Sequence, residues 1–120
     1  MKKSIRLLDF LYTAVARLVE QSEPRTSGRQ ILAFLAVAQA EADGKSIMLS
    51  DIRDIEGSDG QPIIGQSIAQ TFAMLLDPSE REPRGLGWVR QEVDPDDRRR
   101  KYLKLTDKGR AVLESIGGIG

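Results

Sequence analysis

Residues 86–105 contain two short alternating segments joined by a strongly charged turn. The chain reads LGWVRQEV, then DPDDRRR, then KYLKL. Alternation of apolar and polar side chains predicts β-strands, and the aspartate- and proline-rich stretch between them predicts a hairpin turn. We therefore expect an antiparallel pair of strands, with Tyr102, Leu103 and Leu105 carrying the apolar side of the second strand.

The turn of this hairpin concentrates positive charge in a chain whose net charge is zero. The sequence holds 18 Lys and Arg against 18 Asp and Glu, so no field of the whole protein attracts nucleic acid. Any such attraction has to be local. The turn offers four consecutive basic residues directly behind two aspartates: Asp96, Asp97, Arg98, Arg99, Arg100 and Lys101. Taken alone, this run is equally well explained as a solvated turn whose charges neutralise one another.

Composition limits the chemistry that the chain can perform. Its 120 residues suit one domain (residues 1–120), and it has neither cysteine nor histidine. Thiolate chemistry, disulfides, the usual general base and the commonest metal ligand are therefore absent. Asp94, Asp96 and Asp97 make a poor cation site beside three arginines. We expect no enzyme, no metal and no cofactor.

The sequence also predicts a cytoplasmic protein. No segment approaches the length of a membrane-spanning helix, and Arg6 and Asp9 interrupt the apolar residues near the N-terminus, so a signal-peptide core is not expected.

Two helices are predicted before the hairpin. Residues 4–21 carry apolar side chains at spacings of three and four, which is the pattern of an amphipathic helix. Pro24 and several capping residues interrupt it. Residues 29–42 are nearly apolar in their first half and predict a central helix that ends at Asp43 and Gly44.

Shorter elements follow the central helix. Residues 45–49 favour a minor strand, and Ser50 is a candidate N-cap for a short helix over residues 51–57. Pro62 suits the first turn of another helix, which we place at residues 62–76. After the hairpin, Thr106 is expected to cap a last helix over residues 107–116, with Ala111, Val112 and Ile116 packing inward.

The helix predicted at residues 62–76 has an unusual outer face. Its apolar residues fall on one side, whereas the other side is polar and small but uncharged. Amide and hydroxyl groups both donate and accept hydrogen bonds, as contacts to base edges and phosphates require. A low-charge surface helix is the plain alternative. The outer residues are Gly65, Gln66, Ser67, Ala69, Gln70 and Thr71.

The order of the predicted elements is that of a winged helix-turn-helix, a mainly α fold with a small β-hairpin (α+β). In such a unit the second helix lies in the major groove of DNA. The hairpin over residues 89–105 would be the wing, and its arginines suit the adjacent minor groove or its phosphates.

Residues 85–109 resemble the signature of the MarR-type transcriptional regulators. Three short motifs stand at the spacing found in that family. They are Gly85-Leu86 at the start of a strand, Asp94 with Asp97-Arg98-Arg99 at the wing, and Leu105-Thr106 with Gly109 before the next helix. A weaker likeness extends back to about residue 28, so the resemblance places the winged helix-turn-helix core at residues 28–116.

This resemblance implies a regulator, expected to be a repressor, that binds a pseudo-palindromic double-stranded DNA site as a homodimer. Asp97 would orient Arg99 through a charge-assisted hydrogen bond. A small-molecule effector is compatible with the family, although no residue set indicates one. The residues that would touch DNA are Ser50, Gly65, Gln66, Ser67, Gln70, Thr71, Arg98, Arg99, Arg100 and Lys101.

The chain departs from the family pattern in three places. The helix at residues 62–76 lacks the arginine or lysine of many members, and residues 77–83 lengthen the connection to the wing. The sequence stops near Ile116, whereas members continue into a long C-terminal helix that helps to form the dimer. The helix within residues 1–22 could form the dimer alone, or it could pack on its own core.

A different class of function fits the same residues. With zero net charge and an uncharged helix face, a winged helix could bind another protein instead of DNA. The sequence leaves both hypotheses open.

Overall fold

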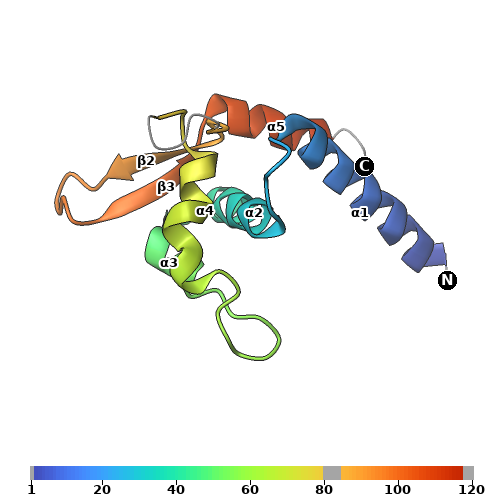
Figure 1. The fold of residues 1–120 in the computed structure, drawn as a ribbon, viewed down its shortest axis with the longest axis horizontal. Coiled ribbons are helices and arrows are strands. Elements are labelled where there is room, and N and C mark those ends of the chain that lie inside the picture. Colours follow the sequence, from blue (N-terminus) through green and yellow to red (C-terminus); the bar gives the residue numbers. More distant parts are fainter. Residues whose placement is uncertain (1, 80–84, 118–120) are drawn as a thin grey trace.

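The computed structural model describes residues 2–79 and 85–117, and over these residues the chain is an α+β fold (Figure 1). The fold combines helices with a small three-stranded antiparallel sheet. In chain order the elements are α1 (Lys2–Gln21), α2 (Gly28–Ala42), β1 (Ile47–Met48), α3 (Leu49–Arg53), a 3-10 turn η1 (Gly65–Ser67), α4 (Ile68–Leu75), β2 (Val89–Val93), β3 (Lys101–Leu105) and α5 (Asp107–Gly117).

The central helix α2 has well-defined ends. Ser27 is its N-cap: its side chain accepts a hydrogen bond from the backbone of Gln30, whose Oε1 in turn accepts from the Ser27 N–H at 2.6 Å. Such a reciprocal pair satisfies two otherwise free amide groups. Asp43 is the C-cap, and Gly44 follows in the left-handed region at φ 68°. The predicted helix and its stop are confirmed.

The three strands pair in the order β1-β3-β2, and both pairings are antiparallel. Val89 stands opposite Leu105 and Val93 opposite Lys101. The short strand β1 joins the other edge of β3, where Ile47 faces Leu103. The predicted hairpin and the predicted minor strand are thus both confirmed.

The core lies between α2 and the sheet. Phe34 and Trp88 are fully buried, and their ring centroids are 4.8 Å apart. Aromatic rings of this size dominate the burial of apolar surface in a small domain. Leu75 of α4 and Val112 of α5 close the core from two further directions. The hairpin and the helix pair α3 and α4 are thereby held to one body.

The start of α3 differs from the prediction. The helix begins at Leu49, and Met48 occupies the N-cap position. The carboxylate of Asp51 accepts a hydrogen bond from the backbone N–H of Met48 at 2.8 Å. Ser50 consequently lies inside the helix and is not its cap. The helix ends at Arg53, four residues before the predicted stop at Gly57.

The segment between α3 and α4 is a folded loop rather than a helix start at Pro62. The N–H of Ile63 donates to the carbonyl of Ile55 at 3.0 Å, and that of Gly57 donates to Gln61 at 2.8 Å. Pro62 is bridged to Glu56 across the loop, so it cannot begin a helix. Residues 54–64 project from the body (Figure 1), and helical structure starts at Gly65.

Helix α5 begins as predicted. The Oγ1 of Thr106 accepts from the N–H of Gly109 at 3.0 Å and donates to the carbonyl of Gly87 at 2.6 Å. Val112 is buried and Ile116 half-buried, as expected. Ala111, however, is exposed, because the inward stripe of α5 runs one residue further along through Leu113.

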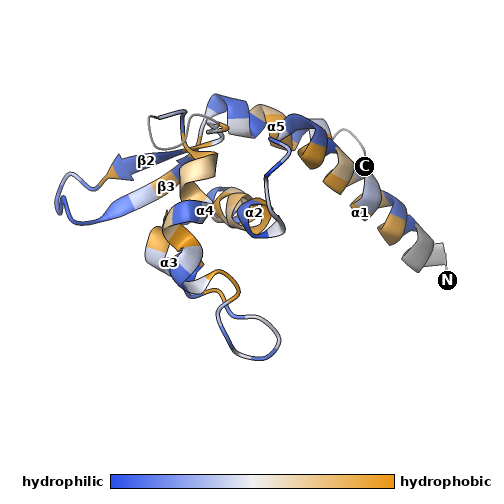
Figure 2. Cartoon of the chain, viewed as in Figure 1, coloured by the Kyte–Doolittle hydropathy of each residue, from blue (hydrophilic) through white to orange (hydrophobic). Residues whose placement is uncertain are grey.

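Helix α1 packs on the body only near its C-terminal end. Leu18 is 3% exposed, and the amide of Gln21 donates to Ser115 of α5 at 3.0 Å. The preceding turns extend beyond the domain with hydrophobic residues uncovered (Figure 2). The exposed large apolar side chains of α1 are Leu7, Leu8, Phe10, Leu11, Tyr12, Val15 and Val19. We expected this helix either to form a dimer or to pack on its own core. In the structure, only its last turns pack on the core.

Within residues 2–79 and 85–117, no helix combines the length and the apolar character needed to cross a membrane.

Candidate nucleic-acid interface

The hairpin tip, residues 94–100, is a closed and ordered turn. The N–H of Asp94 donates to the carbonyl of Arg100, and the N–H of Arg100 donates to the carbonyl of Asp97, both at 2.9 Å. The carboxylate of Asp94 also accepts from the N–H of Asp96 at 2.9 Å. The aspartates therefore bend the backbone into a turn, which is a common use of this side chain.

Asp97 lies between two arginines of the tip. Its Oδ1 accepts from the Nε of Arg99 at 3.3 Å and from the backbone N–H of Arg99 at 3.1 Å. Its Oδ2 is 3.8 Å from the Nε of Arg100. The predicted hydrogen bond from Arg99 to Asp97 is confirmed. The Arg99 side chain is otherwise open to solvent: 92% of the whole side chain is exposed.

The tip is tied to β3 through Asp94. The hydroxyl of Tyr102 donates to Asp94 Oδ2 at 3.2 Å. The pKa of the Asp94 carboxyl is lowered, first by the N–H of Asp96 and then by Tyr102, although partial desolvation acts in the opposite direction. Asp94 thus remains ionised and holds the turn.

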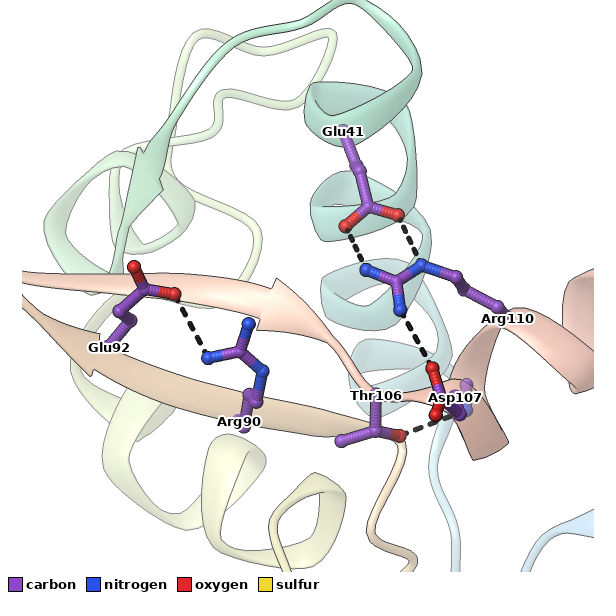
Figure 3. A network of polar contacts seen from close by, with 7 residues as sticks. Glu41, Arg90, Glu92, Thr106, Asp107 and Arg110 are labelled. Atoms are coloured by element: carbon purple, nitrogen blue, oxygen red, sulfur yellow. Dashed lines mark hydrogen bonds and ion pairs between the residues drawn. The ribbon is translucent and has the colours of Figure 1, made fainter.

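Among the described residues, some arginines form ion pairs and others do not. Arg110 forms two hydrogen bonds with Glu41, at 2.9 and 3.1 Å, and a third with Asp107 (Figure 3). Arg90 pairs with Glu92 at 2.9 Å. By contrast, Arg98 of the tip has no ion pair within the described part of the chain. Its charge, together with that of the neighbouring Lys101, is available to an external anion.

The outer face of η1 and α4, called the amide face, presents side-chain amides to solvent. Gln66, Ser67 and Gln70 are exposed, whereas Gly65, at φ 57°, is half-buried. The Ser67 hydroxyl donates to the carbonyl of Ile64 at 2.7 Å, so its oxygen remains an acceptor. Among the described residues, the side-chain amides of Gln66 and Gln70 have no hydrogen-bond partner.

One predicted contact residue, Thr71, lies elsewhere than expected. Thr71 is 6% exposed, and its Oγ1 donates to the Ser67 carbonyl at 3.0 Å. Because α2 packs along this side of α4, the Thr71 side chain faces the protein interior and its placement on the outer face was wrong. The outer face therefore has one side chain fewer than the sequence suggested. Ser50, the expected contact from α3, is half-buried.

The structure adds an arginine that sequence reasoning missed. A polar groove of about 500 Å³ separates the start of α2 from η1 and α4, and Arg29 lies in its wall beside Ser67 and Gln70. The Nε of Arg29 donates to the carbonyl of Ile63 at 3.0 Å, across 34 positions of sequence. No local pattern could have revealed this contact.

The chain matches no model of a known protein family, and comparisons with curated proteins and with solved structures found no significant similarity. Most of the lengthened connection at residues 77–83 lies outside the described residues, which resume at Gly85.

Proposed function

We propose that this protein is a sequence-specific, double-stranded DNA-binding transcriptional regulator of the cytoplasm, of the MarR-type winged helix-turn-helix class that its sequence resembles. In this proposal α3 and η1–α4 are the helix-turn-helix, with α4 in the major groove and the β2–β3 hairpin as the wing. Repression is the expected outcome of binding. The element order α2, β1, α3, α4, β2, β3, α5 supports the assignment.

The observation that carries the proposal is the geometry of the hairpin tip. A solvated turn of mutually neutralised charges would pair each arginine with an acid. Here Asp97 engages Arg99 mainly through Nε, and Arg98 has no pair in the described chain. Guanidinium groups left free in this way match the negative potential of a narrow minor groove and its phosphates.

The amide face supplies the expected means of reading sequence. Gln66 and Gln70 are exposed and lack partners among the described residues. A glutamine amide can pair with the N6 and N7 edge of adenine in the major groove. Since this face is uncharged, the affinity would depend on cations elsewhere.

Selection of bound duplexes from a random pool tests the proposal. The wild-type protein should enrich one sequence class and bind it with a steep salt dependence. Arg98→Ala with Arg99→Ala should weaken binding by about a hundredfold near 0.1 M salt and make the slope of log K against log salt about 2 units shallower. A matched loss of two charges at Arg17 and Arg25 should have little effect. Equal binding by the two double variants would refute the wing.

We further propose that the protein forms a homodimer through α1. The apolar stripe of this helix is exposed over several turns, and a two-fold dimer needs only one self-complementary patch. Pairing two copies would remove from water side chains such as Leu11 and Val15, which are 48% and 52% exposed.

The same stripe favours a second candidate function, a module that binds another protein rather than DNA. An exposed apolar helix is a typical docking element for a partner helix. This candidate predicts no affinity for any duplex even at low salt, together with co-purification of a partner that is lost when α1 is altered. Enrichment of a duplex class by the wild-type protein would decide against it.

A further inference from the structure

The polar groove beside α4 has features of an anion site. Six of its eight lining residues are polar, none of the eight is acidic, and the groove is open to solvent. Two of the lining residues, Ser67 and Gln70, also belong to the amide face proposed to read bases. The groove therefore borders the proposed DNA-binding surface directly.

Arg29 is held in a defined position within this groove. Its Nε donates to the carbonyl of Ile63, which stands two residues before η1. A guanidinium group anchored through Nε leaves its two terminal amino groups for another acceptor. No carboxylate of the described residues forms an ion pair with Arg29, in contrast to Arg53, which pairs with Asp54 at 2.9 Å.

Arg29 also places a positive charge beside α4, whose exposed face has none. The exposed face of η1 and α4 carries no cation, yet phosphate contacts supply most of the affinity of proteins for DNA. A helix that inserts into the major groove lies between two phosphate backbones about 12 Å apart. A cation fixed at the flank of α4 would meet one of them.

We propose that this groove binds a phosphate of the DNA backbone, with Arg29 as the cation and Gln70 as a neighbouring donor. The inference rests on the proposed DNA-binding function and deepens it by naming the contact that replaces the missing charge of α4. The bound group is a phosphodiester, so Arg29 adds affinity and register without reading sequence.

The test compares Arg29→Gln with Arg25→Gln, which removes the same charge from an exposed arginine outside the groove. Binding is measured on the selected duplex and on a scrambled duplex over a series of salt concentrations. Arg29→Gln should weaken both complexes about tenfold near 0.1 M salt and make the salt slope about 0.9 shallower. Arg29→Lys should retain the slope, because the charge stays, while it loses part of the affinity.

The outcomes separate this inference from the proposed function. If the wild-type protein binds a duplex through its wing but Arg29→Gln behaves like Arg25→Gln, the groove is not a phosphate site. If the wild-type protein binds no duplex, both proposals fail.

Substituting single phosphates of the selected duplex by neutral methylphosphonates gives a second measurement on the wild-type protein. Loss of affinity at a phosphate flanking the bases read by α4, retained in Arg29→Lys but absent in Arg29→Gln, supports the contact; uniform tolerance along both strands contradicts it.

Discussion

Gly109 is required where the end of the hairpin meets α5. A Cβ at this position would collide with the carbonyl oxygen of Trp88, the same oxygen that accepts a hydrogen bond from the N–H of Thr106 at 3.0 Å. Gly85 is equally crowded, because its Cβ would collide with the carbonyl of Leu76. Two glycines of the sequence signature thus have a purely structural reason to be glycine.

Replacing Gly109 by alanine should therefore destabilise the protein by about 3 kcal/mol, since backbone atoms rather than a side chain would have to move. The matched substitution Gly28→Ala should change stability by about 0.5 kcal/mol or less, because no atom lies within 4 Å of the added Cβ. Urea unfolding of both variants measures the difference. Similar midpoints for the two would contradict the close approach.

Asp94 makes the hairpin tip sensitive to acid. Its folded pKa is lowered by the N–H of Asp96 and by Tyr102, relative to the ordinary carboxyl pKa of the unfolded chain. A lowered folded pKa means that the stabilisation is fully present above the unfolded pKa and is lost as the pH falls through the folded pKa.

Asp94→Asn should consequently cost stability at neutral pH but little once the pH falls below the folded pKa, where the wild-type carboxyl is also protonated. Thermal unfolding of the two proteins across this pH range checks the expectation. Tyr102→Phe should lose part of the same effect, because it removes one donor to Asp94. A constant difference between wild type and Asp94→Asn at every pH would exclude the assignment.

Single residues were predicted well where the signal is local. The hydrogen bond from Arg99 to Asp97 follows from two neighbouring charges, and the Thr106 cap follows from residue type and position. Ser50 failed as a cap because α3 begins one residue before it, at Leu49, with Met48 at the N-cap position and the Asp51 carboxylate accepting from the Met48 N–H. Arg29 could not be found, since its anchor Ile63 is distant in sequence.

At the scale of whole elements, the strongly periodic segments were predicted correctly. Helices α1 and α2 and both strands of the hairpin follow from patterns that need no knowledge of tertiary contacts. The beginning of α4 was wrong because long-range pairs decided it: the bridge between Glu56 and Pro62 and the bond between Ile63 and Ile55 fold the loop before the helix can start. Proline suits a first helical turn, but here tertiary pairing outweighs that preference.

Helix α1 provides the prediction at this scale. If its apolar stripe joins two copies, Val15→Glu should convert the dimer to a monomer, because an ionised carboxylate in the interface has no partner. Thr13→Glu is the matched control: it also replaces a β-branched residue of α1 by glutamate, but outside the stripe. Sedimentation velocity should show a monomer for the first variant and a dimer for the second. A wild-type protein that is monomeric at high concentration would refute the pairing.

The molecule as a whole is elongated because α1 leaves the body. Its radius of gyration is 15.1 Å, against about 13.6 Å for a compact domain of 120 residues, and its longest extent is 50 Å. The hairpin tip and the N-terminal turns of α1 lie at opposite ends (Figure 1). The proposed dimer contact and the proposed wing are therefore spatially separate, so each can be altered without touching the other.

This separation predicts that dimerisation and wing contacts fail independently. Val15→Glu should bind a duplex with one half-site as tightly as the wild-type protein does, but should lose the extra affinity for a duplex with two half-sites, because that gain comes from linking two binding units. Arg98→Ala with Arg99→Ala should remain dimeric and lose affinity for both duplexes. Titration of each variant against the one-site and two-site duplexes checks this directly. If Val15→Glu weakened the one-site complex as much as the wing variant does, α1 would have to contact DNA itself, and the assignment of the two ends to two separate tasks would be wrong.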